Sequence, residues 1–285
     1  QTLQLIYQQP GREVWDLKQN TLAAVDSNVK IELQPNSQWM LGNESTLAVL
    51  DWCWRTGELK QSVSLPYFPC QAWTGRDVFS PDLARTAVHN RGDWQLDLWD
   101  VTMQCKIAVL QHAAAITSIC FSADGRQLVT GDNEGGVKLW DAATGVLNSK
   151  IDCRRAKYFS LSGIQQVALS SDGVFLATGQ QDGWLLLWHL PTQTPLHDLN
   201  GHLDSVSMLE FSPNGRTLLS GDFAGVYKLW DVATGREIAE LCPENRKGGR
   251  HFSARDWLPD GEHFIFADES GKVRNLSLIT GQVIA

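Results

Sequence analysis

A short apolar segment ending in Trp-Asp or a near relative recurs seven times along the chain, usually with Thr-Gly shortly after it. The clearest copies are Val137–Asp141, followed by Thr144-Gly145, and Tyr227–Asp231, followed by Thr234-Gly235. Successive copies are separated by roughly 37 to 48 residues. A period of this length over the whole chain indicates one supersecondary unit that is repeated, and such units bury a continuous core only by stacking on one another.

One repeat, Gly201 to Gly235 with the segment after it, shows what the unit encodes. Short apolar segments alternate with turn-forming residues every 8 to 12 positions, and no helical period is present. The predicted strands are Val206–Phe211, Thr217–Ser220, Val226–Asp231 and Glu237–Leu241. One four-stranded antiparallel sheet cannot bury both of its faces, whereas radial packing of such sheets, face against face, buries both.

The same frame fits Ile116–Asp141 and Val167–Trp188, and at these residues the chain resembles the WD-repeat β-propeller family over essentially its full length. The resemblance implies an all-β, seven-bladed propeller of four-stranded antiparallel blades in a single domain. Its blades are expected at residues 1–26, 27–65, 72–111, 114–152, 163–200, 203–242 and 251–285. The first blade lacks an innermost strand, so about ten further residues are expected before Gln1 in a longer natural protein.

In this family a His, a Ser or Thr, an Asp and the strand-three Trp form a hydrogen-bonded tetrad. The matching positions here are His112, Thr130 and Trp140; Thr178, Asp182 and Trp188; and His202, Ser220 and Trp230. Glu134 and Ala224 stand at the turn position where the family has Asp, and Ser160 stands in place of His. No copy is therefore expected to be complete, and the blades are expected to differ in stability.

No catalytic, cofactor-binding or metal-binding residue is predicted. The sequence has no Gly-x-Ser-x-Gly elbow, no phosphate-binding glycine loop and no His or Cys at metal-ligand spacing. The carboxylates fall mainly in turn motifs such as Ser-Pro-Asp and Asp-Gly, where turn chemistry explains them. We therefore expect no enzymatic activity from this chain.

The net charge and the cysteines limit which partners and which cellular compartment are expected for the chain. A formal net charge of −8 disfavours general affinity for nucleic acid or anionic membranes. No apolar run approaches the ~20 residues that cross a bilayer. The six scattered cysteines are typical of reduced thiols, which predicts a cytoplasmic location.

Aromatic and basic residues break the repeat pattern in loops on one side of the predicted blades. The candidate partner-binding residues are Trp73, Trp94, Arg154, Arg155, Phe159, Trp184, Phe223, Arg246, Arg250 and His251. Loops on a rigid scaffold concentrate binding residues, and aromatic side chains dominate binding energetics. Local packing of an irregular loop explains the aromatic residues equally well, and a solvated charged loop explains the basic ones.

The resemblance implies a non-catalytic protein-interaction scaffold or sensor module in signalling. Its partner would be a separate protein or a covalently linked upstream effector domain of NTPase, kinase or protease type. The basic loops would orient an acidic partner. Two alternatives stay open: a propeller that binds RNA or a phosphopeptide through the basic loops, and an enzymatic propeller with converging acids, His or Arg.

Overall fold

The computed structural model divides the chain into two compact units, Gln1–Gly75 and Arg76–Ala285. In the first unit it describes the backbone of the strands. In the second, side chains are described for residues 78–89, 94–103, 105–153, 162–199, 201–240, 257–258, 260–265 and 275–278. No helix in the described parts of either unit is long and apolar enough to cross a bilayer.

The first unit contains two antiparallel sheets. The three-stranded sheet consists of β1 (Leu3–Gln8), β2 (Gly11–Asp16) and β3 (Thr21–Ala23). The four-stranded sheet consists of β4 (Lys30–Leu33), β5 (Gln38–Gly42), β6 (Leu47–Cys53) and β7 (Glu58–Leu65). In both sheets the strands pair in chain order, as hairpin-connected strands do.

The second unit contains five four-stranded antiparallel sheets, each again paired in chain order. The first consists of β8 (Val78–Phe79), β9 (Arg85–His89), β10 (Gln95–Asp100) and β11 (Cys105–Gln111). The next consists of β12 (Ile116–Phe121), β13 (Gln127–Asp132), β14 (Gly136–Asp141) and β15 (Leu147–Asp152). The third consists of β16 (Ile164–Leu169), β17 (Phe175–Gln180), β18 (Leu185–His189) and β19 (Thr194–Asp198).

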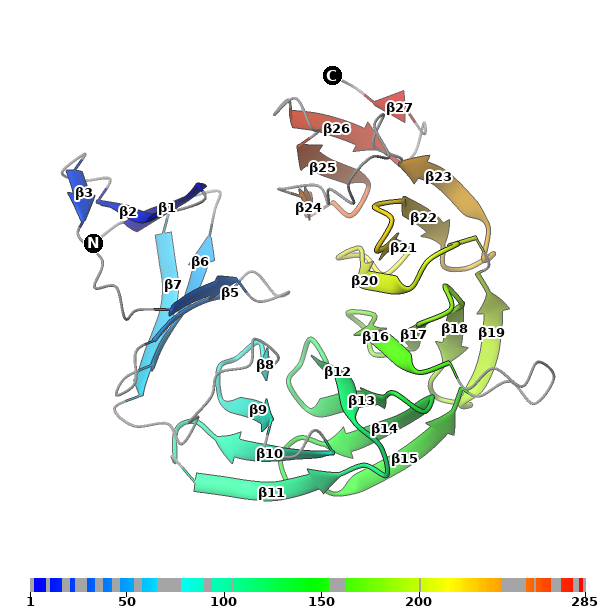
Figure 1. The fold of residues 1–285 in the computed structure, drawn as a ribbon, viewed down its shortest axis with the longest axis horizontal. Coiled ribbons are helices and arrows are strands. Elements are labelled where there is room, and N and C mark those ends of the chain that lie inside the picture. Colours follow the sequence, from blue (N-terminus) through cyan, green and yellow to red (C-terminus); the bar gives the residue numbers. More distant parts are fainter. Residues whose placement is uncertain are drawn as a thin grey trace. The chain divides into compact units, whose positions relative to one another are not determined.

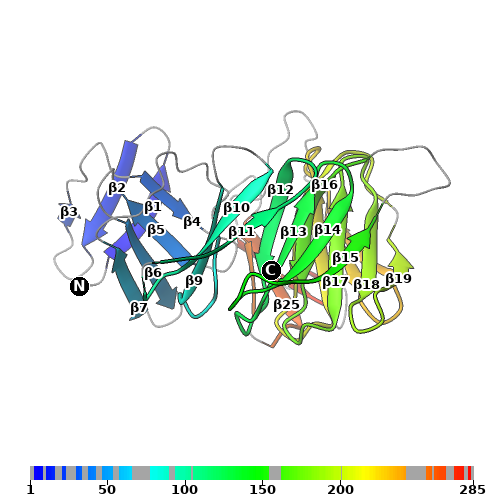
Figure 2. The ribbon, with the colours of Figure 1, turned by 90° about the horizontal axis from the view of Figure 1, so that it is seen from below.

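The remaining two sheets complete this unit. One consists of β20 (Val206–Phe211), β21 (Thr217–Asp222), β22 (Tyr227–Asp231) and β23 (Glu237–Leu241). The other consists of β24 (Arg255–Trp257), β25 (His263–Ala267), β26 (Val273–Ser277) and β27 (Gln282–Val283). Within the unit the sheets follow one another, and β12 packs against both β8 and β16 (Figure 1). Figure 2 shows β12 to β18 running side by side with their turns at the two ends of the strands.

The turn between the first and second strands has one recurring construction in four sheets of the second unit, at Ser80, Ser122, Ser170 and Ser212. Ser122 Oγ donates to Asp124 Oδ1 at 2.6 Å and accepts the backbone N–H of Gln127 at 2.9 Å. Gly125 follows with a φ of 68°, a left-handed conformation that glycine adopts without steric cost. Leu83 takes the same conformation in the β8–β9 turn, with a φ of 58°. The Ser-x-Asp-Gly pattern in the sequence thus indicates this turn for a physical reason.

The cores lie between neighbouring sheets, so each inner sheet is buried on both faces. The third-strand Trp is the largest residue in three of the four described clusters: Trp140 packs with Leu96 and Leu98 of the preceding sheet, and Trp230 packs with Leu185 and Leu187. A third cluster joins β12–β15 to β16–β19, and a fourth joins β20–β23 to β24–β27. Radial stacking of apolar sheets is therefore what the repeat encodes.

The all-β propeller architecture predicted from the repeats agrees with this arrangement of antiparallel sheets. Several strands coincide with the prediction: β12 and β20 have the bounds expected from the sequence. Others move by a residue, since Trp184 precedes β18 and does not begin it. The number of blades and the single-domain organisation stay predictions.

Candidate interaction face and the hydrogen-bond networks behind it

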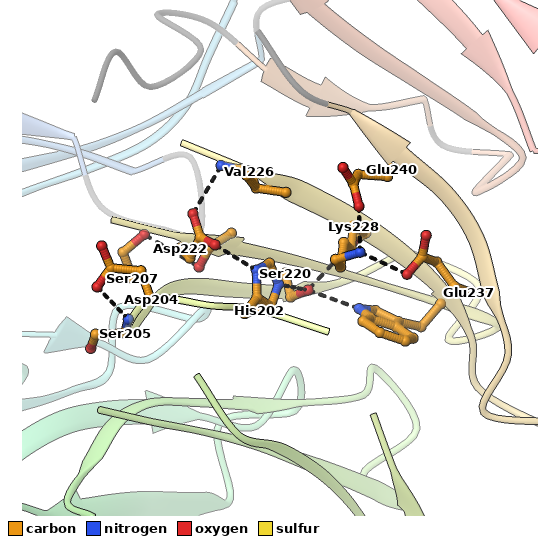
Figure 3. Close-up of polar contacts among 12 residues, drawn as sticks. His202, Asp204, Ser205, Ser207, Ser220, Asp222, Val226, Lys228, Glu237 and Glu240 are labelled. Carbon is orange, nitrogen blue, oxygen red and sulfur yellow. Dashed lines mark hydrogen bonds and ion pairs between the residues drawn. The ribbon is translucent and has the colours of Figure 1, made fainter. Parts of the chain in front are cut away.

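A continuous chain of side-chain hydrogen bonds crosses the sheet β20–β23 (Figure 3). Trp230 Nε1 donates to Ser220 Oγ at 2.8 Å, and Ser220 Oγ lies 2.7 Å from His202 Nε2. His202 Nδ1 lies 3.0 Å from Asp222 Oδ2. Because a carboxylate only accepts, Nδ1 donates this bond, and the hydroxyl of Ser220 can then donate to Nε2. Every member of this buried network is paired.

The network ends on the backbone of the β21–β22 turn. The other carboxylate oxygen of Asp222 accepts the N–H of Val226 at 2.9 Å, and the carbonyl of Asp222 accepts the N–H of Gly225 at 3.1 Å. The N–H of Phe223, the next residue in the turn, donates to the carbonyl of Ser205 at 3.0 Å. A buried tryptophan is thereby coupled to a surface turn, whose backbone has little freedom left.

The sheet β12–β15 repeats the arrangement. Trp140 Nε1 donates to Thr130 Oγ1 at 2.8 Å, Thr130 Oγ1 lies 2.6 Å from His112 Nε2, and His112 Nδ1 lies 2.9 Å from Asp132 Oδ2. The other carboxylate oxygen of Asp132 accepts the N–H of Gly136 at 2.7 Å. Two sheets with different sequences therefore fix their second-to-third strand turn in the same way.

Burial and hydrogen bonding shift the titration of these groups. Burial lowers the pKa of His202 below its ordinary value of 6.5, and the bond to Asp222 opposes this shift without cancelling it. For Asp132, burial opposes ionisation. Hydrogen bonds from the His112 ring and from backbone N–H groups outweigh that penalty and hold the pKa of the carboxyl below 3.8. The structure thus favours an uncharged His202 and a charged Asp132.

The expectation that no tetrad copy is complete is wrong for these two sheets. The acid was sought at Glu134 and Ala224, in the turn, but the bonded carboxylates are Asp132 and Asp222, the last residues of β13 and β21. That strand position points its side chain back toward the His. The sequence did carry a usable signal, because a Gly-Asp pair, Gly131-Asp132 or Gly221-Asp222, follows each His at the same offset.

The sheet β16–β19 keeps only part of the network. Trp188 Nε1 donates to Thr178 Oγ1 at 3.1 Å, as in the other sheets. The sulfur of Cys153 lies 3.9 Å from the same hydroxyl, where the others have the His ring, and Gln180 donates to the Cys153 carbonyl at 3.1 Å. Burial raises the pKa of the Cys153 thiol to about 12, which keeps it protonated at neutral pH. Asp182, predicted for this tetrad, instead donates its backbone N–H to Ser162 Oγ at 3.1 Å.

Lys228 adds an ion-pair cluster to the sheet β20–β23. Its side chain is only 6% exposed, and its Nζ lies 2.8 Å from Glu237 Oε2 and 2.6 Å from Glu240 Oε2. Burial opposes the charge, but the two carboxylates more than compensate and raise the pKa of Lys228. The ammonium also lies 5.9 Å from the centre of the Trp230 ring. This cation is neutralised locally and contributes little charge to the surface.

The second-to-third strand turns and the loops that enter the next sheet pack together at one end of the strands. A Cβ on Gly183 would lie 2.6 Å from the carbonyl oxygen of His202, and one on Gly163 would lie 2.4 Å from that of Asn133. Each turn is therefore covered closely by the following loop. We call the result the turn-and-loop face; its described residues are Trp94, 133–135, 162–163, 181–184, 201–205 and 223–225.

Three large apolar side chains of this face are exposed to solvent. Leu203 is 97% exposed, Trp94 is 59% exposed and Phe223 is 54% exposed. Trp184, on the same face, is partly buried. The sequence reasoning named Trp94, Trp184 and Phe223 but missed Leu203. A sequence signal was available, because Leu203 follows the tetrad position His202 and lies outside the predicted strand that begins at Val206.

The other candidate partner-binding residues lie outside the described residues: Trp73, Arg154, Arg155, Phe159, Arg246, Arg250 and His251. The predicted role of the basic loops therefore stays a prediction. Among the described side chains, no group of three or more His, Cys, Asp or Glu is placed to hold a metal ion.

Comparison with protein families identifies the relationship of the chain. A family model described as the N-terminal domain of nucleolar protein 10-like proteins, a β-propeller, matches residues 94–274. The chain belongs to this family. The matched segment contains both complete networks and most of the turn-and-loop face, so the family assignment and the structural description concern the same part of the molecule.

Individual relatives are WD-repeat proteins of varied names. The chain is 27% identical over 115 residues to periodic tryptophan protein 2 of Arabidopsis thaliana, and the match covers 40% of this chain and 12% of the relative. It is 24% identical over 203 residues to human apoptotic protease-activating factor 1, covering 70% of this chain and 16% of the relative. It is 31% identical over 81 residues to ribosome biogenesis protein ERB1 of Saccharomyces cerevisiae (strain YJM789), covering 28% of this chain and 10% of the relative.

These findings confirm the WD-repeat resemblance and correct one expectation. The chain spans only a small part of the length of these relatives, so their whole-protein activities do not transfer to it directly. The cytoplasmic location predicted from the cysteines is wrong, because the family is that of a nucleolar protein and points to a nucleolar location instead. Reduced thiols are usual in both the cytosol and the nucleus, so the cysteines could not distinguish these two locations.

Proposed function

We propose that this protein is a non-catalytic interaction module that binds a protein partner through its turn-and-loop face. The observation that supports the proposal best is an exposed aromatic side chain, Phe223, on a turn whose backbone is tied to a buried network. Rigid presentation of apolar surface lowers the entropy lost on binding, and aromatic anchors supply much of the affinity of protein interfaces. The WD-repeat relationship supports the same class of function.

The partner is a separate protein or a linked domain of the same chain. Relatives named for ribosome biogenesis make a ribosome-assembly protein the first class to test. Membership of the nucleolar protein 10-like family supports a nucleolar site for this interaction. An RNA- or phosphopeptide-binding role would require the basic loops, which lie outside the described residues.

Crosslinking of the tagged chain in its native cells, followed by capture and mass spectrometry, tests this proposal. Variants Phe223→Ala and Trp94→Ala should each lower capture of the partner at least tenfold, because each removes an exposed anchor. The matched control is Val146→Ala, since Val146 is also exposed but follows β14 at the opposite end of the strand. Capture that depends on Val146 and not on Phe223 or Trp94 would place the contact surface elsewhere.

A further inference from the structure

The turn-and-loop face carries its exposed apolar side chains beside acidic ones, which specifies a kind of partner. We propose that a basic peptide segment with one bulky apolar side chain docks where the sheets β16–β19 and β20–β23 meet, over Leu203 and Phe223. This inference rests on the proposed function, because it names the chemistry of the partner that the same face would bind.

Leu203 and Phe223 come from two segments that are joined directly. The N–H of Phe223 donates to the carbonyl of Ser205 at 3.0 Å, so the β21–β22 turn and the 201–205 loop are adjacent. That loop in turn covers Gly183, in the turn that precedes β18. Single exposed apolar residues are ordinary on protein surfaces. Here two large ones, 97% and 54% exposed, lie on bonded neighbouring segments and can share one ligand side chain.

The backbone that carries Leu203 is fixed from the inside. The preceding residue, His202, is buried, and its two ring nitrogens lie 2.7 Å from Ser220 Oγ and 3.0 Å from Asp222 Oδ2 (Figure 3). The following residue, Asp204, accepts the N–H of Ser205 at 2.7 Å. Leu203 is therefore exposed on a loop whose two flanking residues are held by hydrogen bonds. Such a loop loses little freedom when a ligand binds.

Among the described residues of the face, the charges have one sign. Within its described turns and loops the charged side chains are Glu134, Asp182 and Asp204, all exposed, and none of these residues is Lys or Arg. Lys228, a cation of the same sheet, is buried against two glutamates. A basic segment would be attracted to this surface, and an acidic one repelled. This differs from the acidic partner that the basic loops predict from sequence.

Fluorescence anisotropy with four labelled twelve-residue peptides tests the inference on the full chain. One peptide is Lys/Arg-rich with a central Phe, one is Lys/Arg-rich without it, one is Asp/Glu-rich with the Phe, and one is neutral with the Phe. The first should bind at least tenfold more tightly than each of the others at ~0.15 M salt, where non-specific attraction to an acidic protein is screened. A single-stranded RNA oligonucleotide is included as a competing ligand class.

Variants show whether that binding occurs at the proposed place. Leu203→Ser and Phe223→Ser should each weaken the first peptide at least tenfold, and Asp204→Asn should weaken it several-fold and reduce its salt dependence. Asn at 204 keeps the acceptor for the Ser205 N–H. The controls are Val146→Ser, exposed at the other end of its sheet, and Asp124→Asn, in a turn whose β20–β21 counterpart already contains Asn214. Thermal melts verify that every variant is folded.

Each result has a definite reading. Selective binding of the first peptide that is lost in Leu203→Ser and Phe223→Ser, but not in the controls, supports the inference. Equal binding of both basic peptides, preference for the acidic peptide or the RNA, or indifference to Leu203 and Phe223 overturns it. If these peptides fail while crosslinking still captures a partner through Phe223, the proposed function stands and only the partner chemistry is wrong.

Discussion

The sheets β20–β23 and β16–β19 share a backbone plan and differ in their polar interior. Both pair a third-strand Trp with a second-strand hydroxyl, through Ser220 in one and Thr178 in the other. Only the first continues through a His to an Asp that holds the turn; the second substitutes Cys153 and Gln180. The strand registers are nevertheless the same around the tryptophans. Apolar packing is thus sufficient for the sheet, and the polar network adds control of the turn.

The tryptophans should matter equally in the two sheets, and this is the largest expected effect. Trp230→Ala and Trp188→Ala should each lower the free energy of unfolding by ~3–5 kcal/mol, because each removes a buried aromatic side chain from between two sheets. Trp94→Ala, at an exposed position, should change it by less than ~0.5 kcal/mol. Urea unfolding of the three variants measures these values. A small effect of Trp188→Ala alone would mean that the two cores are not equivalent.

Removal of Asp222 from one sheet, or of its counterpart Gln180 from the other, should lower the free energy of unfolding by different amounts. Asp222→Ala leaves the buried His202 N–H without its acceptor and frees the Val226 N–H, a loss of ~1–3 kcal/mol. Gln180→Ala removes one neutral hydrogen bond to the Cys153 carbonyl and should cost ~1 kcal/mol. Hydrogen exchange should also become faster in the β21–β22 turn of Asp222→Ala. If that turn stays as protected as in the parent chain, the network does not control it.

The pH dependence of stability should carry the signature of His202, the smallest of the three effects. Because burial lowers its pKa in the folded protein below 6.5, the unfolded chain binds the proton first. Stability is therefore fully present above pH ~6.5 and declines as pH falls below that value. Melting temperatures at pH 7.5, 6.5 and 5.5 measure the slope, and His202→Gln should flatten it. The loss linked to Asp132 belongs to a lower window, beginning below pH ~4, since its pKa lies under 3.8. If the pH dependence of the melting temperature is unchanged in His202→Gln, other titrating groups cause it.

Much of the fold follows from local rules that can be applied to the sequence. Strand β20 and the turn at Ser212 carry their own signals, in alternating apolar residues and in a Ser-x-Asn-Gly pattern that forms its own hydrogen bonds. The hydroxyl and Trp positions of the networks could be assigned for the same reason. The acids were assigned wrongly, because the family pattern directed attention to the turn, while the register of β21 places Asp222 opposite Val206 and within reach of the His.

The repeat by itself determined that the second unit forms antiparallel four-stranded sheets that stack on one another, because periodicity, turn chemistry and apolar content are local properties of a sequence. Only the tertiary structure decided that Cys153 takes the place of a His, that Lys228 is neutralised, and that the exposed Leu203 and Phe223 lie on neighbouring segments joined by a backbone hydrogen bond. Those outcomes depend on contacts between residues that are ~20 or more positions apart or in different strands. No local pattern encodes which of two candidate side chains reaches such a partner, because the distance between them is set by the packing of the sheets.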